Sequence, residues 1–430
     1  MNNDFYCPSP WTGGFFTHTE QKACCTHRSI KIPSPLKYLS GDYIIDNPHP
    51  GDFLKDVKHS IISGNLDSNC QRCKDQESQG IRSLRQVFVD QAKNLDIAEV
   101  RDPDAPSVPQ AIEVRLSNLC NFKCRMCFPM YSSLLDKEVS ENPQLKKYFL
   151  RDEVDYGKVH SNQQLIDDII TMIPNLKWIN LTGGEPMILP EVMNLIDEII
   201  RQGYESNMAL HITTNCSTIH PRMLEHFKKF KKIQLTLSLD GIDKTAEYIR
   251  HGTVWDKVNS NFHQYGELLT KNPHIDANVN IALSAYSILD IDRTIDYICQ
   301  LRKQYGMSQL RNHYGMTVNM VQALGHLNYS VLTGPARKLA IESTTKALTI
   351  LEEKVLSVMI HTKDAVDLHK QLQGIKAVLE TQPESSSKWN KFVSYTRELD
   401  KIRNEEFESV FGFKLWQGQF GLDINADSVW

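Results

Sequence analysis

Strands and helices alternate along the middle of this 430-residue chain, and the alternation limits the fold more than any other feature. From residue 111, short runs rich in Val, Ile and Leu alternate with longer segments whose apolar residues recur at helical spacing. About six such units predict an α/β fold with a parallel sheet and right-handed crossovers. Both an open doubly wound sheet and an incomplete barrel fit this pattern. The predicted strands are 111–116, 177–181, 209–213, 233–239, 277–283 and 316–322, and the predicted helices are 162–172, 190–202, 254–269 and 292–305.

The regions before and after this middle part lack its alternation of strands and helices. Residues 1–100 are irregular and rich in cysteine, with a helix expected around Gln71–Asn94. Three prolines within Arg101–Pro109 predict a linker. We therefore expect three domains, at 1–100, 108–330 and 331–430. The last is expected to cover the preceding domain with helices at Ala336–Met359, Ala365–Thr381 and Ser387–Phe411.

Composition narrows the classes of partner. The 52 acidic and 48 basic residues give a net charge of -4, which offers no argument for nucleic acid or for an anionic membrane as partner. No apolar run approaches the roughly 20 residues that span a bilayer. The first residues lack the basic and apolar blocks of a signal peptide. The simplest expectation is a cytoplasmic protein.

Ten cysteines then need an explanation other than disulfides, because cytosolic thiols are kept reduced. Eight of the ten precede residue 128, and such clustering favours metal ligation. Cys120, Cys124 and Cys127 follow the first predicted strand of the alternating region with the spacing C-x3-C-x2-C. Three thiolates can hold a four-iron cluster and leave one iron without a protein ligand, and an open position of this kind is what a substrate or cofactor needs.

Three more polar motifs follow the next predicted strands. They are Gly183-Gly184-Glu185-Pro186, Thr213-Thr214-Asn215 and Ser238-Leu239-Asp240-Gly241. In this order, and together with the cysteine triple, they resemble the radical S-adenosylmethionine (SAM) enzymes over roughly 110–325. The resemblance implies a partial (β/α)6 TIM-like barrel. It also implies reductive cleavage of SAM at a [4Fe-4S] cluster, which yields a 5′-deoxyadenosyl radical that takes hydrogen from a substrate.

The same resemblance assigns roles to individual residues. Cys120, Cys124 and Cys127 would bind the catalytic cluster, and the strand Val279–Ala285 would pack on adenine. The other implied SAM contacts are Gly183, Gly184 and Glu185 for the amino group, Ser238 and Arg250 for the carboxylate or ribose, and Asn215 near the ribose. Two positions depart from the family pattern: Met126 stands where an aromatic residue is common, and Cys216 stands where glycine is common.

The earlier cysteines predict a second site. Cys70-Gln-Arg-Cys73 is a C-x2-C pair of the kind used for zinc and iron–sulfur sites. With Cys7 and Cys24 it resembles the auxiliary-cluster module called twitch, a shortened SPASM domain, here placed before the barrel. The expected ligands of a second [4Fe-4S] cluster are Cys7, Cys24, Cys70 and Cys73. Cys25 is the alternative to Cys24 because adjacent strand side chains point to opposite faces. Zinc, and ligation by His18 or His27, remain open.

The expected function is hydrogen abstraction from a peptide or protein side chain, supported by an external electron donor of the flavodoxin or ferredoxin type. The first alternative is a radical dehydrogenase acting on a small alcohol or sugar. A non-catalytic scaffold braced by iron–sulfur or zinc, and an enzyme using zinc and thiol chemistry, are alternatives of other classes. The catalytic acid or base is not identifiable among the 15 His, the 15 Tyr and the many carboxylates.

Overall fold

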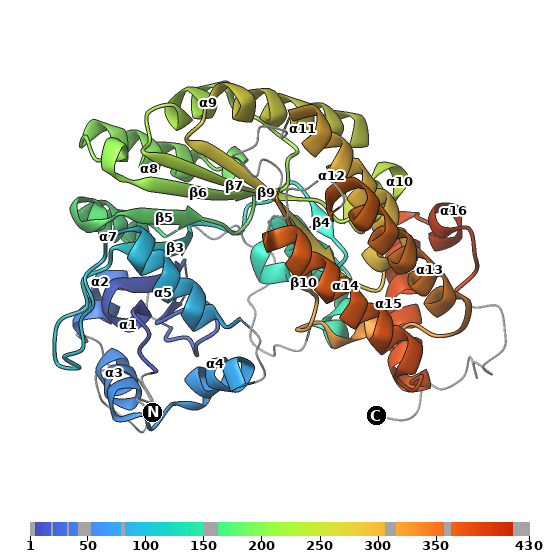
Figure 1. Cartoon of the computed structure of the whole chain (residues 1–430), viewed down its shortest axis with the longest axis horizontal. Helices are drawn as coiled ribbons and strands as arrows, with labels where there is room; N and C mark the ends of the chain where they lie inside the picture. Colours follow the sequence, from blue (N-terminus) through green and yellow to red (C-terminus); the bar gives the residue numbers. More distant parts are fainter. Residues whose placement is uncertain are drawn as a thin grey trace. The chain divides into compact units, whose positions relative to one another are not determined.

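The computed structural model describes residues 5–18, 20–31, 34–41, 53–78, 82–149, 162–305, 315–356 and 363–415. The chain divides into two compact units. Unit 1 comprises Met1–Cys120, Val159–Thr214 and Ile219–Leu235, and unit 2 comprises Asn121–Lys158, Asn215–Thr218 and Thr236–Trp430. Figure 1 labels most of the helices and strands of both units.

Unit 1 is built on a mostly parallel sheet. Its strands are β1 (Gly13–Thr17), β2 (Gln21–Lys22), β3 (Ala111–Arg115), β5 (Trp178–Leu181), β6 (Ala209–Thr214) and the first residues of β7 (Lys232–Ser238). The order runs β6-β5-β3-β1-β2. β1 pairs in parallel with β3, β3 with β5 and β5 with β6, while β2 is antiparallel to β1. The cysteine-rich N-terminal region therefore contributes strands to this sheet, which the sequence analysis did not predict.

The alternation of burial along the strands explains why they form. On β3, Ile112 and Val114 are fully buried, whereas Glu113 and Arg115 are only partly so. The helices α7 (Gln163–Met172), α8 (Pro190–Arg201) and α9 (Pro221–Phe227) bury apolar stripes of the kind that pack on a sheet. Asn162 caps α7 by accepting from the backbone N–H of Leu165.

The N-terminal part of unit 1 is more helical than expected. Its helices are α1 (Ser9–Thr12), α2 (Pro35–Ser40), α3 (Phe53–Ser63), α4 (Ser68–Ser78) and α5 (Leu84–Asn94). The prediction of one helix around Gln71–Asn94 is wrong, because α4 ends at Ser78 and α5 begins anew after Ser83. Ser83 and Gln86 form a reciprocal capping box, which fixes that second start.

Unit 2 contains the last residues of β7 and the parallel pair β9 (Ile275–Leu283) and β10 (Gly315–Met320). A separate antiparallel pair joins β4 (Lys123–Cys124) to β8 (Arg250–His251). The helices of this part are α6 (Ser133–Glu141), α10 (Asp243–Ile249), α11 (Trp255–Lys271) and α12 (Ile291–Tyr305). In the described ranges the six strands predicted from the alternating pattern are all present, as β3, β5, β6, β7, β9 and β10. The α/β expectation is thus confirmed, with eight mostly parallel strands counting β1 and β2.

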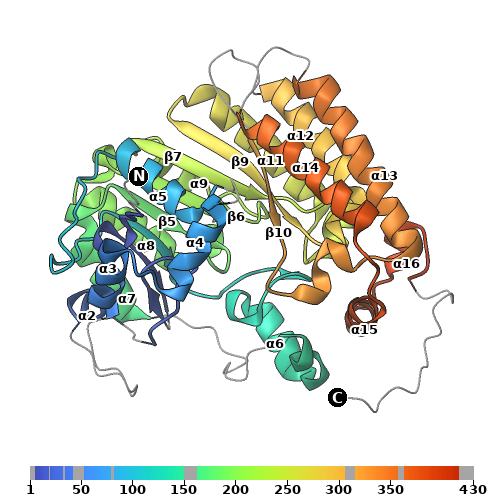
Figure 2. The same cartoon turned by 60° about the horizontal axis from the view of Figure 1, so that its bottom comes forward.

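The C-terminal residues of unit 2 are helical, as predicted, but the bounds differ. The helices are α13 (Gly334–Leu351), α14 (Lys363–Thr381), α15 (Ser386–Arg403) and α16 (Phe407–Phe411). α12, α13 and α14 lie side by side (Figures 1 and 2). The predicted helix Ser387–Phe411 is two helices, because Asn404 adopts the left-handed region at φ 52° and ends α15. The predicted helix Ala336–Met359 gives way after Leu351 to a π-helical turn, Glu352–Leu356, and its last residues lie outside the described ranges.

Short 3-10 turns complete the described structure. In unit 1 they are Ile173–Asn175, Pro186–Ile188 and Glu205–Asn207. In unit 2 they are Pro129–Tyr131, Pro143–Tyr148, Ser287–Asp290, Gly325–Leu327 and Tyr329–Val331.

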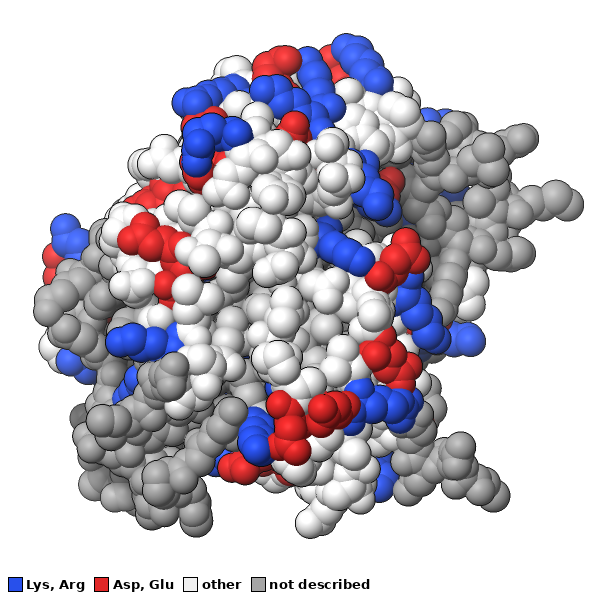
Figure 3. Space-filling view, turned by 90° about the vertical axis from the view of Figure 1, so that its left-hand side faces the viewer, with Lys and Arg blue, Asp and Glu red and all other residues white. Residues whose placement is uncertain are grey.

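The face shown in Figure 3 carries interspersed Lys, Arg, Asp and Glu around a largely uncharged middle. The described residues of this face therefore form no broad basic patch of the kind that binds nucleic acid. Among the described helices, none combines the length and the apolar character needed to cross a membrane.

Candidate functional site

The predicted cluster ligands Cys124 and Cys127 lie at the start of unit 2, and Cys120 is the last residue of unit 1. Cys124 belongs to β4, where it is the register partner of Arg250 on β8. The backbone N–H of Cys127 donates to the carbonyl of Cys124 over 3.1 Å, which closes a tight turn between the two. Cys120 is buried, and Cys124 and Cys127 are partly buried.

The surroundings of Cys124 are electrostatically distinctive. Burial raises the pKa of its thiol, and the charge of Arg250 acts in the opposite direction. Arg250 is held by Asp240, whose Oδ2 lies 2.6 Å from its Nε. Burial would lower the pKa of Arg250, but the charges of Asp240 and Cys124 outweigh burial and raise it. A permanent cation thus stands beside a thiol that binds metal only as the thiolate.

The Gly183-Gly184-Glu185 motif packs on the residue before Cys120. Both glycines have positive φ, 78° and 57°. A Cβ on Gly184 would lie only 2.2 Å from the carbonyl oxygen of Leu119, so no other residue fits there without a backbone shift. The N–H of Glu185 donates to that same carbonyl over 2.9 Å. The motif and the cysteine loop are therefore in direct contact within unit 1.

The Glu185 carboxylate is buried, and its hydrogen bonds hold its own loop in place. Its Oε1 accepts from the Thr214 hydroxyl at 2.7 Å and from the N–H of Met187 at 3.0 Å. These bonds explain why an acid follows the two glycines. They orient the loop whose carbonyls were predicted to meet the SAM amino group.

Asn215 is tied to the cysteine loop inside unit 2. Its Nδ2 donates to Oδ1 of Asn121 at 3.0 Å, and its Oδ1 accepts from the N–H of Ser217 at 2.9 Å. The following residue, Cys216, has φ 62° and is fully buried, which is a position where glycine is normally preferred. Its carbonyl accepts from Nδ2 of Asn261 at 2.8 Å. Cys216 thus occupies a strained backbone site in the core of unit 2.

Ser238 ends β7, and the functional residue of that segment that the sequence analysis missed is Asp240. Besides Arg250, the Asp240 carboxylate accepts from the N–H of Ala282 on β9 at 2.6 Å. Asp240 was part of the quoted Ser-Leu-Asp-Gly motif, but its role depends on Arg250 ten residues later and on β9. Only the folded chain brings these three together.

Arg125, inside the cysteine triple, is a second residue that was missed. It is fully buried and donates to Asp400 and Glu405, each at 2.5 Å, and to the carbonyl of Tyr248 at 3.0 Å. The Tyr395 hydroxyl donates to the carbonyl of Arg125 at 2.7 Å. The helix α15 and the residues just after it therefore hold the cysteine loop of unit 2 in place.

Four of the N-terminal cysteines form a second group within unit 1. Burial raises the pKa of Cys7, and the thiols of Cys24, Cys70 and Cys73 raise it further. Burial likewise raises the pKa of Cys70 to about 12, with Cys24 and Cys73 contributing. The thiols are thus close enough to act on one another electrostatically. These are the four residues expected to hold the auxiliary cluster.

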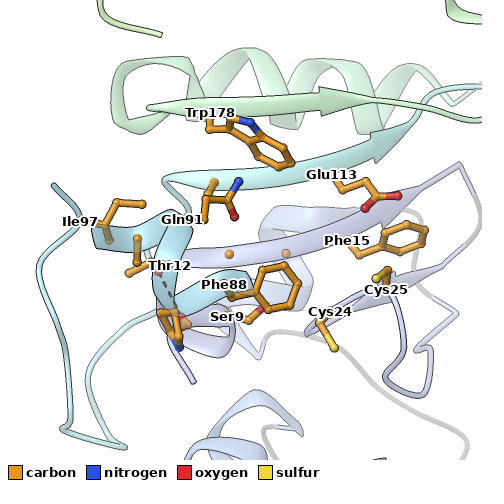
Figure 4. A pocket seen from close by; sticks show the side chains of 15 residues that line it. Ser9, Thr12, Phe15, Cys24, Cys25, Phe88, Gln91, Ile97, Glu113 and Trp178 are labelled. Atoms are coloured by element: carbon orange, nitrogen blue, oxygen red, sulfur yellow. Dashed lines mark hydrogen bonds between the residues drawn. The ribbon is translucent and has the colours of Figure 1, made fainter. Parts of the chain in front are cut away.

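Cys25 has different neighbours from Cys24. Burial raises its pKa to about 12, and after burial the strongest influence is the carboxylate of Glu113 on β3. Figure 4 shows the two side chains pointing apart, with Cys25 directed toward Phe15 and Glu113. His27, a possible substitute ligand, lies 3.4 Å from Asp67.

A cation stands beside the four-thiol group. Arg85 forms a two-pronged ion pair with Glu77, at 2.8 and 2.6 Å, and donates to the carbonyl of Tyr6 at 2.9 Å. The charges of Cys7 and Cys73 contribute to raising the pKa of Arg85. Arg85 on α5 thereby links α4, which carries Cys73, to the backbone just before Cys7.

The two candidate donor sets consist of free thiols, the ligand type that holds iron–sulfur clusters. In the described part of the chain, no three His, Cys, Asp or Glu side chains are placed to ligate one metal ion. A four-iron cluster instead spreads its thiolates over separate irons. Cationic or backbone donors near the sulfurs, such as Arg250 and Arg85, suit the negative charge of such a cluster.

With this geometry described, comparison with known proteins is informative. Residues 114–267 match the radical SAM superfamily. That segment contains Cys120, Cys124 and Cys127 and the SAM contacts predicted between Gly183 and Arg250, so the expectation of a radical SAM segment is confirmed. The strand Val279–Ala285, predicted to pack on adenine, lies beyond it.

Curated relatives share part of this region. A GTP 3′,8-cyclase of Campylobacter fetus subsp. fetus is 29% identical over 149 residues, 34% of this chain and 40% of the relative. The radical SAM cyclopropyl synthase TigE of Paramaledivibacter caminithermalis is 22% identical over 203 residues, 47% of this chain and 40% of the relative. The chain thus spans about 40% of the length of these curated relatives.

Solved structures show only distant similarity. The structure of anSMEcpe with bound AdoMet has a TM-score of 0.37 at 16% identity, covering 57% of this chain and 60% of that one. Streptococcus suis SuiB bound to S-adenosylmethionine also has a TM-score of 0.37, at 15% identity, covering 75% of this chain and 65% of that one.

Proposed function

We propose that this chain cleaves SAM reductively at a [4Fe-4S] cluster held by Cys120, Cys124 and Cys127, and abstracts hydrogen from a peptide or protein side chain. The observation that carries the proposal is the superfamily match over 114–267, which contains the cysteine triple and the SAM contacts predicted between Gly183 and Arg250. When bound, the cluster and SAM together would supply the 5′-deoxyadenosyl radical. The strands around them would form a partial (β/α)6 barrel.

The chain's own residues would bind and orient SAM. Arg250, fixed by Asp240 at 2.6 Å, presents a planar cation suited to the SAM carboxylate. The backbone of Gly183 and Gly184 would accept from the SAM amino group, while Glu185 keeps that loop in place through Thr214. Ser238 and Asn215 would contact the carboxylate or ribose.

We also propose a closed auxiliary [4Fe-4S] cluster bound by Cys7, Cys24, Cys70 and Cys73, in a module of the twitch type. The mutual influence of the four thiols supports this set, and the proximity of Cys25 to Glu113 favours Cys24 over Cys25. Such a cluster would relay electrons or brace the fold. The initial electron would come from an external donor of the flavodoxin or ferredoxin type.

The test is anaerobic reconstitution followed by measurement of iron and of 5′-deoxyadenosine. We expect about eight irons per chain, and 5′-deoxyadenosine from SAM once a reductant is added. Cys124→Ala should lose SAM cleavage and retain the fold. Cys299→Ala, a buried cysteine far along the chain, is the matched control and should retain cleavage. A folded, iron-loaded wild-type sample that leaves SAM intact would refute the proposal and favour the scaffold alternative.

The alternative substrate class is a small molecule. Two of the curated relatives are named GTP 3′,8-cyclase, a name that gives a nucleotide as the substrate. Deuterium transfer separates the two classes. Label appearing in 5′-deoxyadenosine from a deuterated peptide supports the main proposal, and label from a deuterated alcohol, sugar or nucleotide supports the alternative.

A further inference from the structure

Three polar side chains form a row across the sheet of unit 1. Glu113 on β3 is the register partner of Asn180 on β5, and Asn180 is the register partner of His211 on β6. Phe15 on β1 pairs with Glu113 and extends the row on its other side. Register partners in parallel strands project to the same face of a sheet, so these side chains stand next to one another.

Asn180 is the unusual member of the row. Its side chain is only 7% exposed, yet no described residue donates to its Oδ1. A buried amide oxygen without a partner costs roughly 1–3 kcal/mol. Nearly all buried polar groups in proteins are hydrogen-bonded, so an unpaired one needs an explanation. A partner that arrives from outside the chain is one.

The two neighbours of Asn180 in the row differ: His211 is poorly suited to carry charge, whereas Oε1 of Glu113 lies 3.7 Å from Nη2 of Arg115 in an ion pair. Burial lowers the pKa of His211 to about 4, so that its imidazole is neutral at neutral pH. Burial also raises the pKa of Glu113, against the influence of Arg115. The Thr182 hydroxyl, just before Gly183, lies 3.4 Å from Oε1 of Glu113. The row therefore begins next to the loop predicted to meet SAM.

A hollow opens beside the Glu113 end of the row (Figure 4). The space in it is about 450 Å³ when the solvent at its open side is counted, so the enclosed part is smaller. Its walls include the rings of Phe15, Phe88 and Trp178. Trp178 precedes Asn180 by two residues and shares its face of β5, and its ring centroid lies 5.8 Å from that of His211.

We propose that the row Glu113–Asn180–His211 is the polar wall of the substrate site, binding the uncharged amide groups of a peptide whose apolar side chain enters the adjoining hollow. The inference rests on the proposed function and names the part of the site that recognises the substrate. A peptide group offers one donor and one acceptor, and its N–H is the donor that the unpaired amide oxygen of Asn180 lacks. A charged ligand group would lose its hydration beside Asn180 and His211, neither of which carries an opposite charge.

The test replaces Asn180 with leucine, which has a similar volume and no polar atoms. Binding of N-acetylphenylalanine amide, a blocked residue with two peptide groups and an aromatic side chain, is measured by anaerobic calorimetry on the reconstituted protein. We expect the wild type to bind this probe at least about tenfold more tightly than Asn180→Leu does. We also expect the wild type to bind it more tightly than N-acetylphenylalanine, whose carboxylate is charged.

Thermal stability distinguishes a binding role from a structural one. Because Oδ1 of Asn180 has no partner among the described residues, Asn180→Leu should melt at or above the wild-type temperature. The control is Asn261→Leu. Asn261 is also buried but donates to the carbonyl of Cys216 at 2.8 Å, so its replacement should lower the melting temperature.

Three results would overturn the inference. They are no binding of the probe by the wild type, equal binding by Asn180→Leu, and a loss of stability in Asn180→Leu as large as that in Asn261→Leu. The proposed function is measured separately, by SAM cleavage in the wild type. Probe binding without SAM cleavage would refute the proposed function, and with it the assignment as a substrate site, and would leave only the peptide binding by the row.

Discussion

Replacing Arg125 with methionine tests whether the C-terminal helix α15 holds the cysteine loop. Arg125 has no exposed surface and donates to Asp400 and Glu405, each at 2.5 Å. Its guanidinium also lies 3.6 Å from the ring centroid of Tyr248. Methionine keeps the approximate length of the side chain and removes the charge and all the donors.

The structure allows the cost to be estimated. Removing one partner of a buried ion pair typically costs about 3–5 kcal/mol, because the remaining charge is left uncompensated. Here the carboxylates keep other donors, since Asp400 accepts from the Tyr248 hydroxyl at 2.8 Å and Glu405 contacts His251 at 2.5 Å. We therefore expect the lower end, about 3 kcal/mol. At roughly 2–4 °C per kcal/mol, the melting temperature of unit 2 should fall by about 6–12 °C.

Calorimetry of the reconstituted protein, together with iron analysis, measures this effect. The matched control is Arg222→Met, because Arg222 also pairs with a carboxylate, Asp197, at 2.5 Å but is 57% exposed. An exposed pair of this kind contributes about 0–1 kcal/mol, so the control should melt nearly like the wild type. If Arg125→Met also melted like the wild type, with full iron content, α15 would not be an anchor of the loop.

Three further predictions concern the two sites and the pH dependence of stability. Cys7→Ala should lose about four irons per chain on reconstitution while Cys25→Ala retains them, and equal losses would contradict the assignment of Cys24 over Cys25. Gly184→Ala should weaken SAM binding at least about tenfold, since its Cβ would meet the carbonyl oxygen of Leu119 at 2.2 Å. The control is Gly203→Ala, because Gly203 also has a positive φ, 79°, but no atom lies within 4 Å of the added Cβ. It carries only the backbone strain of about 1–2 kcal/mol and should bind SAM normally in the same titration. Burial lowers the pKa of His211 to about 4, so the unfolded chain takes up the proton first and the free energy of unfolding falls as the pH drops from about 6.5 to 4. Urea unfolding across that window should show a shallower fall in His211→Gln than in the wild type. Parallel curves would contradict the lowered pKa of His211.

The strands were predictable because their signal is local. Each of the six strands expected from the alternating pattern is present, with ends that differ by at most two residues. A period of two in apolar residues needs no knowledge of the partner strand. β1 was missed because it is short, begins with Gly13-Gly14, and gains its stability from pairing with β3, about one hundred residues later.

For the predicted site residues, too, the sequence could not reveal features that depend on contacts between distant residues. The expectation that Cys24 and Cys25 are neighbours on a strand is wrong, because β2 ends at Lys22 and both cysteines lie in the turn that follows. Strand alternation could not have shown which of them joins Cys7, Cys70 and Cys73. That choice depends on Glu113, which lies near Cys25 in the folded unit. Asp240 and Arg125 both lie inside motifs that the sequence analysis identified, Ser238–Gly241 and Cys120–Cys127. Their roles need Arg250, Asp400 and Glu405, and no spacing rule links residues that are 275 positions apart.

The helix α15 is best understood as part of the proposed cluster site in unit 2. The pair β4–β8, which holds Cys124, is only two residues long on each strand and cannot be rigid alone. α15 compensates through charged contacts. Arg403 donates to Glu138 at 2.7 Å, and Glu138 also accepts from Lys123, the residue before Cys124, at 2.5 Å. Burial raises the pKa of the Cys124 thiol, and the charge of Arg403, after that of Arg250, acts in the opposite direction. The helix would thus both position a ligand and favour its thiolate form, which explains why a helical C-terminal region accompanies the strands that carry the motifs.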